Sequence, residues 1–388
     1  MSAPGQPRVL LLHNRYRFEG GEERSVALQQ RALANAGVTH RLLERHSADT
    51  PRLRAAAALL RGGAAEQEVA AAVGELGADV VHAHNMQPLI GPRGLAAARA
   101  AGARVVLHLH NARLFCAIGV AARDGAPCFR CRGRNTLPGL VLNCRESVPE
   151  AVAYAAGLAL HQQLALDSTD RFVAPSRWAA GQLARLGVPA DRLDVLPHYL
   201  PAEETADGSR AHQGRYVLAA GRLSAEKGLD LAIEAAAQAH VPLWIAGDGP
   251  GRAELEQQAR ELGAPVELLG AVPRDQMPDL LRGAAALVLS SRSHEFSPFS
   301  VLEAMGAGVP VVATRSGGVP ELIGAERCVP MADAPALAEA TRARWRDPDR
   351  RRREGEELLG RVRERHTEQR YLQDLLAIYA SSRSTPAQ

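Results

Sequence analysis

This sequence contains a single lysine, Lys227, in the octet GRLSAEKG. The choice of lysine at this one position needs a chemical explanation. Arginine fills every other position among the 46 lysines and arginines, including Arg222 in the same octet. Arginine binds oxygens with a planar fork of donors, whereas lysine supplies a compact point charge that fits between oxygens. Two cations in a loop after a predicted strand are suited to neutralise the charge that develops on a departing pyrophosphate. The alternative is chance survival of one lysine in an arginine-rich composition.

A phosphate-binding helix start is predicted within SRSHEFSPFSVLEAMGAGVPVVAT, residues 291–314. Ser297 is a favourable N-cap, and Pro298 suits the first helical position. The backbone amides of Phe299 and Ser300 would then point out of the positive end of the helix, where anions bind well. The pattern therefore predicts phosphate contacts at Phe299 and Ser300.

Two glutamates with the spacing E-x7-E accompany this helix start, Glu295 in the preceding loop and Glu303 inside the helix. Helical side chains lean toward the N-terminus, so the Glu303 carboxylate is expected to reach a group beside the phosphate, such as a ribose diol. Glu295 is expected in the same pocket, at a different place. The alternative is a surface helix with two ordinary acids.

Two glycine-rich turns follow predicted strands. The turn SGGVPELI (316–323) follows PVVAT, and GDGPGRAEL (247–255), which contains Gly249, follows PLWIA. Glycine allows the backbone to approach a ligand closely. The second turn is the weaker signal, because glycine-rich strand-to-helix turns also serve purely structural purposes.

Four of the five cysteines share one short segment with the spacing C-x11-C-x2-C-x12-C, and they are Cys116, Cys128, Cys131 and Cys144. The surrounding residues 112–146 resemble a loop rich in Gly, Pro and Arg. In a reducing compartment, this spacing indicates a structural tetrahedral thiolate site for Zn²⁺, with an iron–sulfur cluster or four free thiols as alternatives. Cys328 is expected to be a buried strand residue.

The elements that must position these residues are short β-branched runs alternating with amphipathic helical stretches. The predicted strands are RVLLLHN, DVVHAHN, RVVLHLHN, RFVAPS and LDVLPHY in the first half, and RYVLAAGRL, PLWIAGDG, VELLGAV, AALVLSSR and PVVATRSGG in the second. The alternation predicts an α/β fold with two Rossmann-like, doubly wound parallel-sheet domains that face each other across a cleft. In such sheets ligands sit beyond the carboxyl ends of the strands, where the candidate residues lie.

The domain boundaries follow from one polar stretch without periodicity, residues 201–214, which is interpreted as a linker. An N-terminal domain at 1–200 and a C-terminal domain at 215–365 are expected on its two sides. Residues 366–388 are expected to form a C-terminal helix that docks back on one of the domains.

The bulk composition is that of an enzyme-sized globular protein. With 388 residues, 46% hydrophobic and 23% charged, the chain is too long for one core and too apolar for disorder. A net charge of +3 disfavours a dedicated nucleic-acid binder, including a zinc module built on the cysteine loop. Neither a signal peptide nor a bilayer-spanning stretch is recognised, so the expected location is the cytoplasm. Peripheral contact at the inner face of the membrane is an open alternative.

The ordered set of motifs resembles the retaining family 4 glycosyltransferases of GT-B fold, in a branch with a cysteine-rich loop. The residues that carry the resemblance are Gly221-Arg222-Leu223, Lys227-Gly228, Gly247-Asp248-Gly249, the pair Glu295 and Glu303, and Gly317-Gly318 with Glu321. In the first half, RYRFEGGEERSVALQQRALANAG, DVVHAHN, RVVLHLHN and GVPADRLDVLPHYL are similar to the family's glycine loop, strand ends and approach to the linker. Together these motifs cover most of the chain in the family's order.

The resemblance implies a donor and the residues that bind it. It implies a nucleoside-diphosphate sugar of UDP or GDP type, and a glycan, lipid-linked or small-molecule acceptor. Arg222 and Lys227 would hold the diphosphate, Glu295 the donor sugar hydroxyls and Glu303 the ribose. His110 would lie near the reacting sugar. Gly20 and Gly21 would approach the diphosphate, and no catalytic metal is implied.

Two positions depart from the family pattern. Ser297 stands where an aromatic residue is common, and His198-Tyr199 replaces the usual asparagine-glycine. The alternative within the same fold is a nucleotide-sugar 2-epimerase, whose acid–base carboxylates are not evident in the first half. The remaining histidines, including His82 and His84, are expected to be packed or surface residues and not ligands.

Overall fold

The computed structural model describes residues 6–16 and 20–381. The chain folds into two compact units. Unit 1 contains Met1–Ala121, Phe129–Pro197 and Tyr371–Gln388, and unit 2 contains Ala122–Cys128 and His198–Arg370. Each unit has its own six-stranded parallel sheet with flanking helices. The predicted α/β fold with two Rossmann-like sheets is thereby confirmed.

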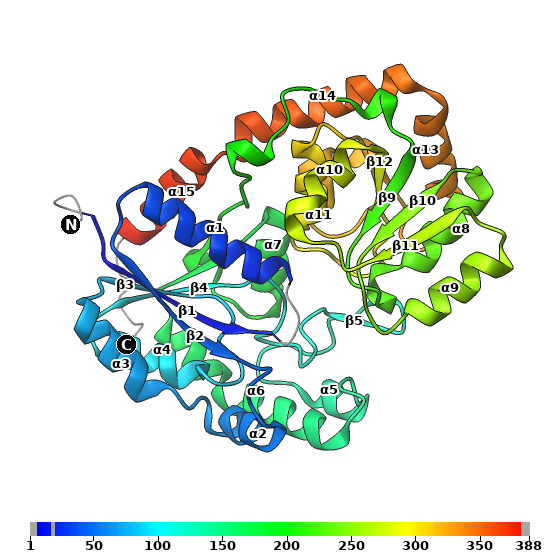
Figure 1. The fold of residues 1–388 in the computed structure, drawn as a ribbon. Helices are drawn as coiled ribbons and strands as arrows, with labels where there is room; N and C mark the ends of the chain where they lie inside the picture. The colour runs from blue at the N-terminus through cyan, green and yellow to red at the C-terminus, as the bar shows by residue number, and fades with distance from the viewer. Residues whose placement is uncertain (1–5, 17–19, 382–388) are drawn as a thin grey trace. The chain divides into compact units, whose positions relative to one another are not determined.

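Unit 1 has the strand order β2-β1-β3-β4-β7-β8. Its strands are β1 (Val9–Arg15), β2 (His40–His46), β3 (Val80–Ala83), β4 (Arg104–His108), β7 (Arg171–Ala174) and β8 (Leu193–Val195). Its helices are α1 (Gly21–Asn35), α2 (Arg52–Arg61), α3 (Glu66–Leu76), α4 (Gly91–Ala100), α5 (Leu137–Val141), α6 (Val148–Ser168) and α7 (Arg177–Leu186). Helix α1 covers one face of the sheet, while α3 and α4 cover the other (Figure 1).

The central strands of unit 1 are buried on both faces. In β1, the residues Val9, Leu10, Leu11 and Leu12 have no exposed surface, which explains why this strand is a continuous apolar run. The edge strand β2 was not among the predicted strands. Its sequence HRLLERH is mostly polar because only Leu43 of this strand is buried.

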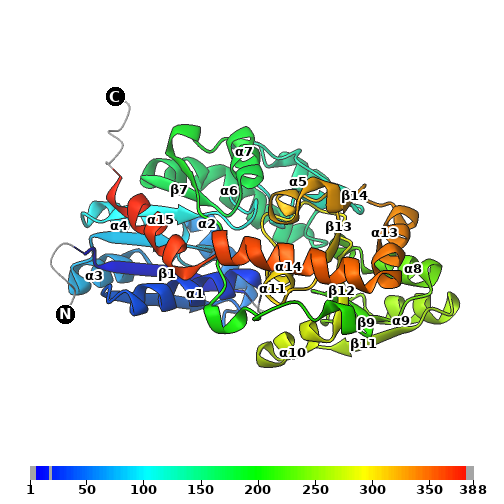
Figure 2. The ribbon, with the colours of Figure 1, turned by 90° about the horizontal axis from the view of Figure 1, so that it is seen from above.

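The last helix, α15 (Glu368–Ala380), completes the core of unit 1 from its residue Tyr371 onward. Tyr371, Leu375, Ile378 and Tyr379 are buried. Figures 1 and 2 both show α15 beside α1, and the Gln29 side chain of α1 donates a hydrogen bond to the Tyr379 hydroxyl at 2.9 Å. A segment at the far end of the sequence therefore packs with the first helix.

Unit 2 has the strand order β11-β10-β9-β12-β13-β14. Its strands are β9 (Tyr216–Ala220), β10 (Leu243–Ala246), β11 (Val266–Gly270), β12 (Ala284–Leu289), β13 (Val311–Thr314) and β14 (Cys328–Val329). Its helices are α8 (Leu229–Ala239), α9 (Arg252–Glu261), α10 (Met277–Arg282), α11 (Phe299–Gly306), α12 (Val319–Ile323), α13 (Ala334–Arg346) and α14 (Pro348–Arg365). Helices α8 and α13 pack together over the main apolar core, and α11 lies on the opposite face of the sheet (Figure 1).

Two segments belong to units that the sequence did not suggest. The small hairpin of β5 (Ala122–Arg123) and β6 (Ala126–Pro127) lies in the cysteine-rich stretch but clusters with unit 2. The stretch 201–214, expected as a linker, is part of unit 2, where the Ser209 hydroxyl donates to the Gly308 carbonyl at 2.5 Å. The Ser209 amide also donates to the Glu356 carboxylate at 2.7 Å. These bonds fix the stretch against α11 and α14.

Within residues 6–16 and 20–381, none of the helices combines the length and the apolar character that a bilayer crossing requires.

Candidate active site

In unit 2, the loops after β9 and β12 bring Lys227 and Glu295 into contact although 68 positions separate them. The Lys227 Nζ donates to Glu295 Oε1 at 2.7 Å, and the Ser291 hydroxyl donates to the same oxygen at 2.5 Å. Burial alone lowers the pKa of Lys227, but the Glu295 carboxylate raises it above its ordinary value. Burial alone raises the pKa of Glu295, but Lys227 and Ser291 together lower it. Both groups therefore stay charged at neutral pH.

The glycine turn after β13 holds the backbone of Glu295 in place. The Gly318 amide donates to the Glu295 carbonyl at 2.8 Å, and the Glu295 amide donates to the Ser316 hydroxyl at 3.0 Å. Gly317 has a φ of +55°, and a Cβ there would stand 2.1 Å from the Glu295 carbonyl oxygen. Only glycine satisfies both the left-handed backbone and this close approach. The turn predicted to approach a ligand thus also positions Glu295.

The GDG turn after β10 packs against the loop that carries Arg222. A Cβ on Gly249 would stand 2.5 Å from the Leu223 carbonyl oxygen, and the Gly251 amide donates to that oxygen at 2.9 Å. The Leu223 amide donates to the Asp248 carbonyl at 3.0 Å. Packing alone therefore explains Gly249. Arg222 is exposed beside this turn, and donor contacts by Arg222 and Gly249 stay predictions.

Helix α11 begins one residue later than expected. Its first residue is Phe299, its N-cap is Pro298, and no side chain caps it, so the assignment of Ser297 as N-cap is wrong. The cause is the extended backbone of Pro298, with φ −75° and ψ 123°. The buried Phe299 ring stacks on His198 with centroids 4.3 Å apart. Ser300 is the second helical residue, and phosphate binding by these amides stays a prediction.

Glu303 lies on the second turn of α11 and is partly buried. The Arg274 guanidinium stands 3.7 Å from Glu303 Oε1. Glu303 therefore has a cation beside it, and its predicted contact with a ribose is untested.

In unit 1, a pocket at the carboxyl ends of β3 and β4 is lined by polar groups that include Tyr16, Glu22, His110, Asn111 and Arg113. The Tyr16 hydroxyl donates to Glu22 Oε2 at 2.8 Å, and the Asn111 amide donates to the same oxygen at 3.2 Å. The Arg113 guanidinium lies over the Tyr16 ring, 4.9 Å from its centroid. His110, singled out in the sequence, is thus one member of a larger polar group.

Glu22 supplies a buried carboxyl to this pocket, and its pKa is strongly perturbed. Burial raises its pKa to about 7, against partial compensation from His13, Tyr16 and Arg113. A carboxyl with this pKa holds or releases a proton near neutral pH, which is the range where general acid–base groups act. Sequence reasoning missed Glu22, because its burial comes from elements distant in the chain.

Gly20 and Gly21 lie at the start of α1. Gly20 is the N-cap, and Gly21 is the first helical residue. The Glu23 carboxylate accepts hydrogen bonds from the Gly20 amide at 2.8 Å and from the Tyr16 amide at 3.1 Å. Burial alone raises the pKa of Glu23, but these bonds and His13 hold it below its ordinary value. The carboxylate therefore organises both described ends of the glycine loop, whose residues 17–19 lie outside the described part.

Several histidine side chains of unit 1 pack in a row next to His110. The His84 Nδ1 lies 2.9 Å from the His110 Nε2, and the His108 and His110 rings stack with centroids 4.0 Å apart. His13, His82, His84 and His108 are buried. Sequence reasoning missed this row; the signal that could have indicated it is the alternation H-x-H in HAH and HLH, on two strands that pair.

The cysteines are thiols without disulfides. Cys128 clusters with unit 2, whereas Cys116, Cys131 and Cys144 belong to unit 1. In the described part of the chain, the one group of three or more His, Cys, Asp or Glu side chains with mutually close ligand atoms consists of histidines. The structure does not gather the four thiols, and a metal bound by them stays a prediction. Cys328 is buried and begins β14.

Two family models match consecutive parts of the chain. Residues 20–198 match the description "Glycosyl transferase 4-like domain", and residues 202–358 match "Glycosyl transferases group 1". Together they cover most of the sequence, one in each predicted half. The chain belongs to glycosyltransferase family 4. The family predicted from the motifs and its GT-B fold are thereby confirmed, without the cysteine-rich branch.

Relatives of this family 4 chain are themselves named glycosyltransferases. It is 30% identical over 181 residues to the putative colanic acid biosynthesis glycosyltransferase WcaL of Escherichia coli, covering 41% of this chain and 44% of that protein. It is 34% identical over 139 residues to a GDP-mannose-dependent α-(1-6)-phosphatidylinositol dimannoside mannosyltransferase of Mycobacterium tuberculosis. This match covers 34% of this chain and 36% of that protein. The matches thus span less than half of the length of these relatives.

A solved structure is similar over nearly the whole family 4 chain. The Anabaena protein HepE, solved in complex with UDP-glucose, has a TM-score of 0.68 at 18% identity, covering 96% of this chain and 98% of that one. At this identity the likeness shows the fold.

Proposed function

We propose that the protein transfers a sugar from a nucleoside-diphosphate sugar to an acceptor hydroxyl with retention of the anomeric configuration. The observation that carries the proposal is the contact between Lys227 and Glu295, which places a fixed cation beside a fixed carboxylate at the carboxyl end of the unit 2 sheet. The cation suits a diphosphate, and the carboxylate suits sugar hydroxyls. GDP-mannose, named as the donor of one relative, and UDP-glucose, bound in the HepE structure, support a donor of this class.

Each predicted residue has a role in this proposal. Arg222 and Lys227 neutralise the diphosphate as the bond between its terminal oxygen and the anomeric carbon breaks. Glu295 binds the donor sugar hydroxyls and Glu303 the ribose. The amides of Phe299 and Ser300, with Gly249, Gly20 and Gly21, contact the phosphates. The acceptor oxygen attacks the same face of the anomeric carbon, and its proton passes to the departing phosphate oxygen.

The acceptor is proposed to bind in the unit 1 pocket. His110 and Glu22 offer hydrogen-bonding groups there, and Arg113 adds a positive charge. Such groups fit a hydroxyl-rich acceptor, whether a glycan, a lipid-linked saccharide or a small molecule.

Exposed apolar side chains of unit 1 support a peripheral membrane contact as part of the proposal. Leu137 and Val141 are 60% and 73% exposed on α5, and Val148 is 61% exposed on α6. Exposed arginines lie just before α5, at Arg130, Arg132 and Arg134. Apolar and basic groups together bind anionic lipid surfaces. Sedimentation with anionic vesicles tests this, and a Leu137→Ser, Val141→Ser chain that binds them as well as the wild type would contradict it.

The transfer itself is tested with a screen of UDP-, GDP-, ADP- and dTDP-sugars. The correct donor should raise the melting temperature, since it binds only the folded chain. It should also be hydrolysed slowly without acceptor, whereas an epimerase would return a changed sugar still joined to its nucleotide. Glu295→Gln should lower turnover at least tenfold while nucleotide affinity changes little. An equal loss of nucleotide affinity would show that Glu295 does not act on the sugar.

A further inference from the structure

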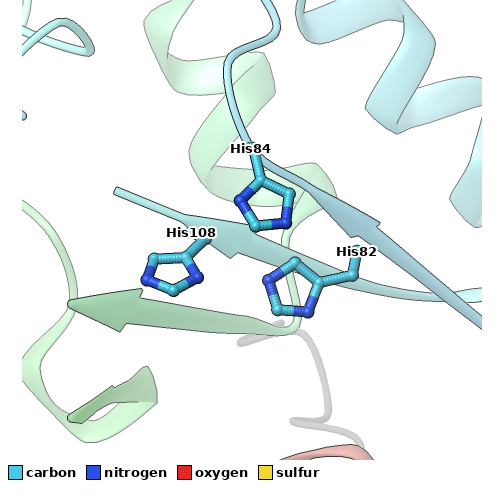
Figure 3. Close-up of side chains that lie close together, drawn as sticks. All are labelled: His82, His84 and His108. Carbon is cyan, nitrogen blue, oxygen red and sulfur yellow. The ribbon is translucent and has the colours of Figure 1, made fainter. Parts of the chain in front are cut away.

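Three buried histidines of unit 1 form a cluster that the proposed transfer does not use. Their ring nitrogens include one atom from each residue that all lie within 4.8 Å of one another, and the residues are His82, His84 and His108. Figure 3 shows the three rings gathered from two adjacent strands. Each residue is at most 2% exposed. Such a concentration of imidazoles in a core needs a chemical reason, because buried polar groups are costly unless they find partners.

The sheet itself brings the three rings to one face. His82 lies on β3 and His84 directly follows that strand, so their side chains point to the same side. His82 is paired in register with Val106 of β4, which places His108 beside His84. The ring centroids are 4.8 Å apart for His82 and His84, and 5.3 Å apart for His84 and His108. The backbone register therefore fixes the cluster, and no loop conformation is needed to assemble it.

We propose that His82, His84 and His108 bind one divalent transition-metal ion, with Zn²⁺ as the fitting ion. Neutral imidazole is a good ligand for Zn²⁺, and three histidines with a fourth position for water form a known type of zinc site. Zn–N bonds of about 2.0–2.1 Å in a tetrahedron put the nitrogens about 3.3 Å apart. The rings would thus close by about 1.5 Å at most, which side-chain rotation supplies.

The hydrogen-bond partners of His82 leave its Nε2 atom available to bind a metal ion. The His82 Nδ1 lies 2.9 Å from the Tyr379 hydroxyl, which can accept its proton. The Gln29 Nε2, 3.1 Å from the same nitrogen, is a donor and bonds to the Tyr379 hydroxyl at 2.9 Å. The His82 Nε2 is buried and has no hydrogen-bond partner among the described residues. Metal-bound histidines characteristically pass their other ring N–H to an acceptor such as this hydroxyl, which orients the ring. With Nδ1 protonated toward Tyr379, the Nε2 lone pair of His82 faces the metal.

The site would also position His110. The His84 Nδ1 lies 2.9 Å from the His110 Nε2. A metal on the His84 Nε2 leaves the proton on Nδ1, which then donates to His110 and fixes both its tautomer and its ring plane. His110 would present its own Nδ1–H to the pocket of unit 1. The metal thus acts on His110 through one intervening ring.

The experiment measures Zn²⁺ binding by the full chain without any sugar or nucleotide. Because the cysteines are a second candidate for zinc, the parent is the variant Cys128→Ser, Cys131→Ser. After chelation and dialysis against micromolar Zn²⁺, we expect about one Zn²⁺ per parent chain. Substituted Co²⁺ should give a tetrahedral spectrum without a thiolate charge-transfer band. A parent without zinc, or a Co²⁺ spectrum with the thiolate band, would overturn the proposal.

Substitutions in the parent then locate the ion. His82→Gln with His108→Gln should abolish binding and the Zn²⁺-dependent rise in melting temperature. The matched control His46→Gln, an exposed histidine of unit 1, should keep both. Zinc retained by the double histidine variant would refute the site.

A conservative change keeps the test decisive if the double variant does not fold. Tyr379→Phe removes only the hydroxyl that faces the His82 Nδ1. It should weaken Zn²⁺ binding about 10- to 100-fold, as loss of an outer partner does at other sites. Unchanged affinity in this variant would show that His82 is not a ligand.

Discussion

At Lys227 one small ammonium satisfies a carboxylate and, in the proposed function, also faces the diphosphate of the donor. Its Nζ already donates to Glu295 at 2.7 Å, and its side chain keeps 30% exposure on the other side. A guanidinium is wider and planar, so it would engage the carboxylate in a fork and displace it. The contact with Glu295 therefore adds a structural reason for lysine to the electrostatic one inferred from the sequence.

The first prediction concerns this position. Lys227→Ala should lower kcat about 10²- to 10³-fold, the usual loss when one group that stabilises developing charge is removed. Lys227→Arg should also lower kcat, by at least tenfold, with the melting temperature nearly unchanged. Steady-state kinetics with the donor found by the screen measures both, and the exposed Arg353→Ala serves as control. A fully active arginine variant would contradict this explanation of the lysine.

The second prediction concerns the buried carboxyl of Glu22. Its pKa is raised from 4.5 to about 7 by burial, so the folded chain holds the proton more tightly than the unfolded chain. The stability from this proton is complete below pH 4.5 and is lost as the pH rises to 7. Glu22→Gln should therefore gain stability relative to the wild type over this range, by up to about 3 kcal/mol. Urea unfolding of both proteins at pH 4 to 8 measures the difference in their unfolding free energies. A difference that does not change with pH would contradict the prediction.

At the scale of elements, the sequence predicted most strands of both sheets because parallel strands buried on both faces are apolar runs. It missed the edge strand β2, because the residues of this strand are mostly polar. It also placed the start of α11 one residue early. Lys227 and Glu295 were each predicted, but not their contact, because it depends on how two loops meet. The histidine cluster was missed because it depends on the register between β3 and β4. That register cannot be read from the sequence of either strand alone.

The glycine turn beside Glu295 gives the third prediction. In Gly317→Ala the new Cβ would meet the Glu295 carbonyl at 2.1 Å, on a backbone with φ +55°. We expect a loss of about 1–3 kcal/mol in unfolding free energy and at least tenfold in kcat, because Glu295 must move.

Gly263 is the matched control for this change. It has nearly the same φ, +58°, but a Cβ added there would meet no atom of the described residues within 4 Å. Gly263→Ala therefore carries the backbone strain without the collision, so it should cost less stability and leave kcat unchanged. Equal effects of the two substitutions on kcat would contradict the positioning of Glu295 by Gly317.

At the scale of the whole molecule, the chain leaves unit 1 after Pro197 and returns to it at Tyr371. The returning helix is held by polar contacts as well as burial, since Tyr379 bonds to Gln29 and lies beside the His82 ring. The Arg104 guanidinium also donates to the Tyr379 carbonyl at 3.3 Å. The last helix is thus an integral part of the first sheet's packing.

The fourth prediction tests this arrangement. Leu375 of α15 is fully buried, so Leu375→Ala should cost about 2–5 kcal/mol of unit 1 stability. Hydrogen exchange should quicken at amides of β1, β3 and β4, and stay unchanged in β9 and β12. Gln373→Ala, on the exposed side of the same helix, should change neither. Faster exchange confined to unit 2 would contradict the packing of α15.

The return of α15 has a consequence for biosynthesis. The ribosome completes residues 198–370 before it makes the helix that unit 1 needs, so the unit begun first is finished last. Until the ribosome has made α15, Gln29 and His82 of a nascent chain lack Tyr379, and the apolar surface that Leu375 will cover is open to water. A chain stalled near position 370 would therefore carry a folded second half tethered to an unfinished first half, a natural substrate for chaperones and proteases.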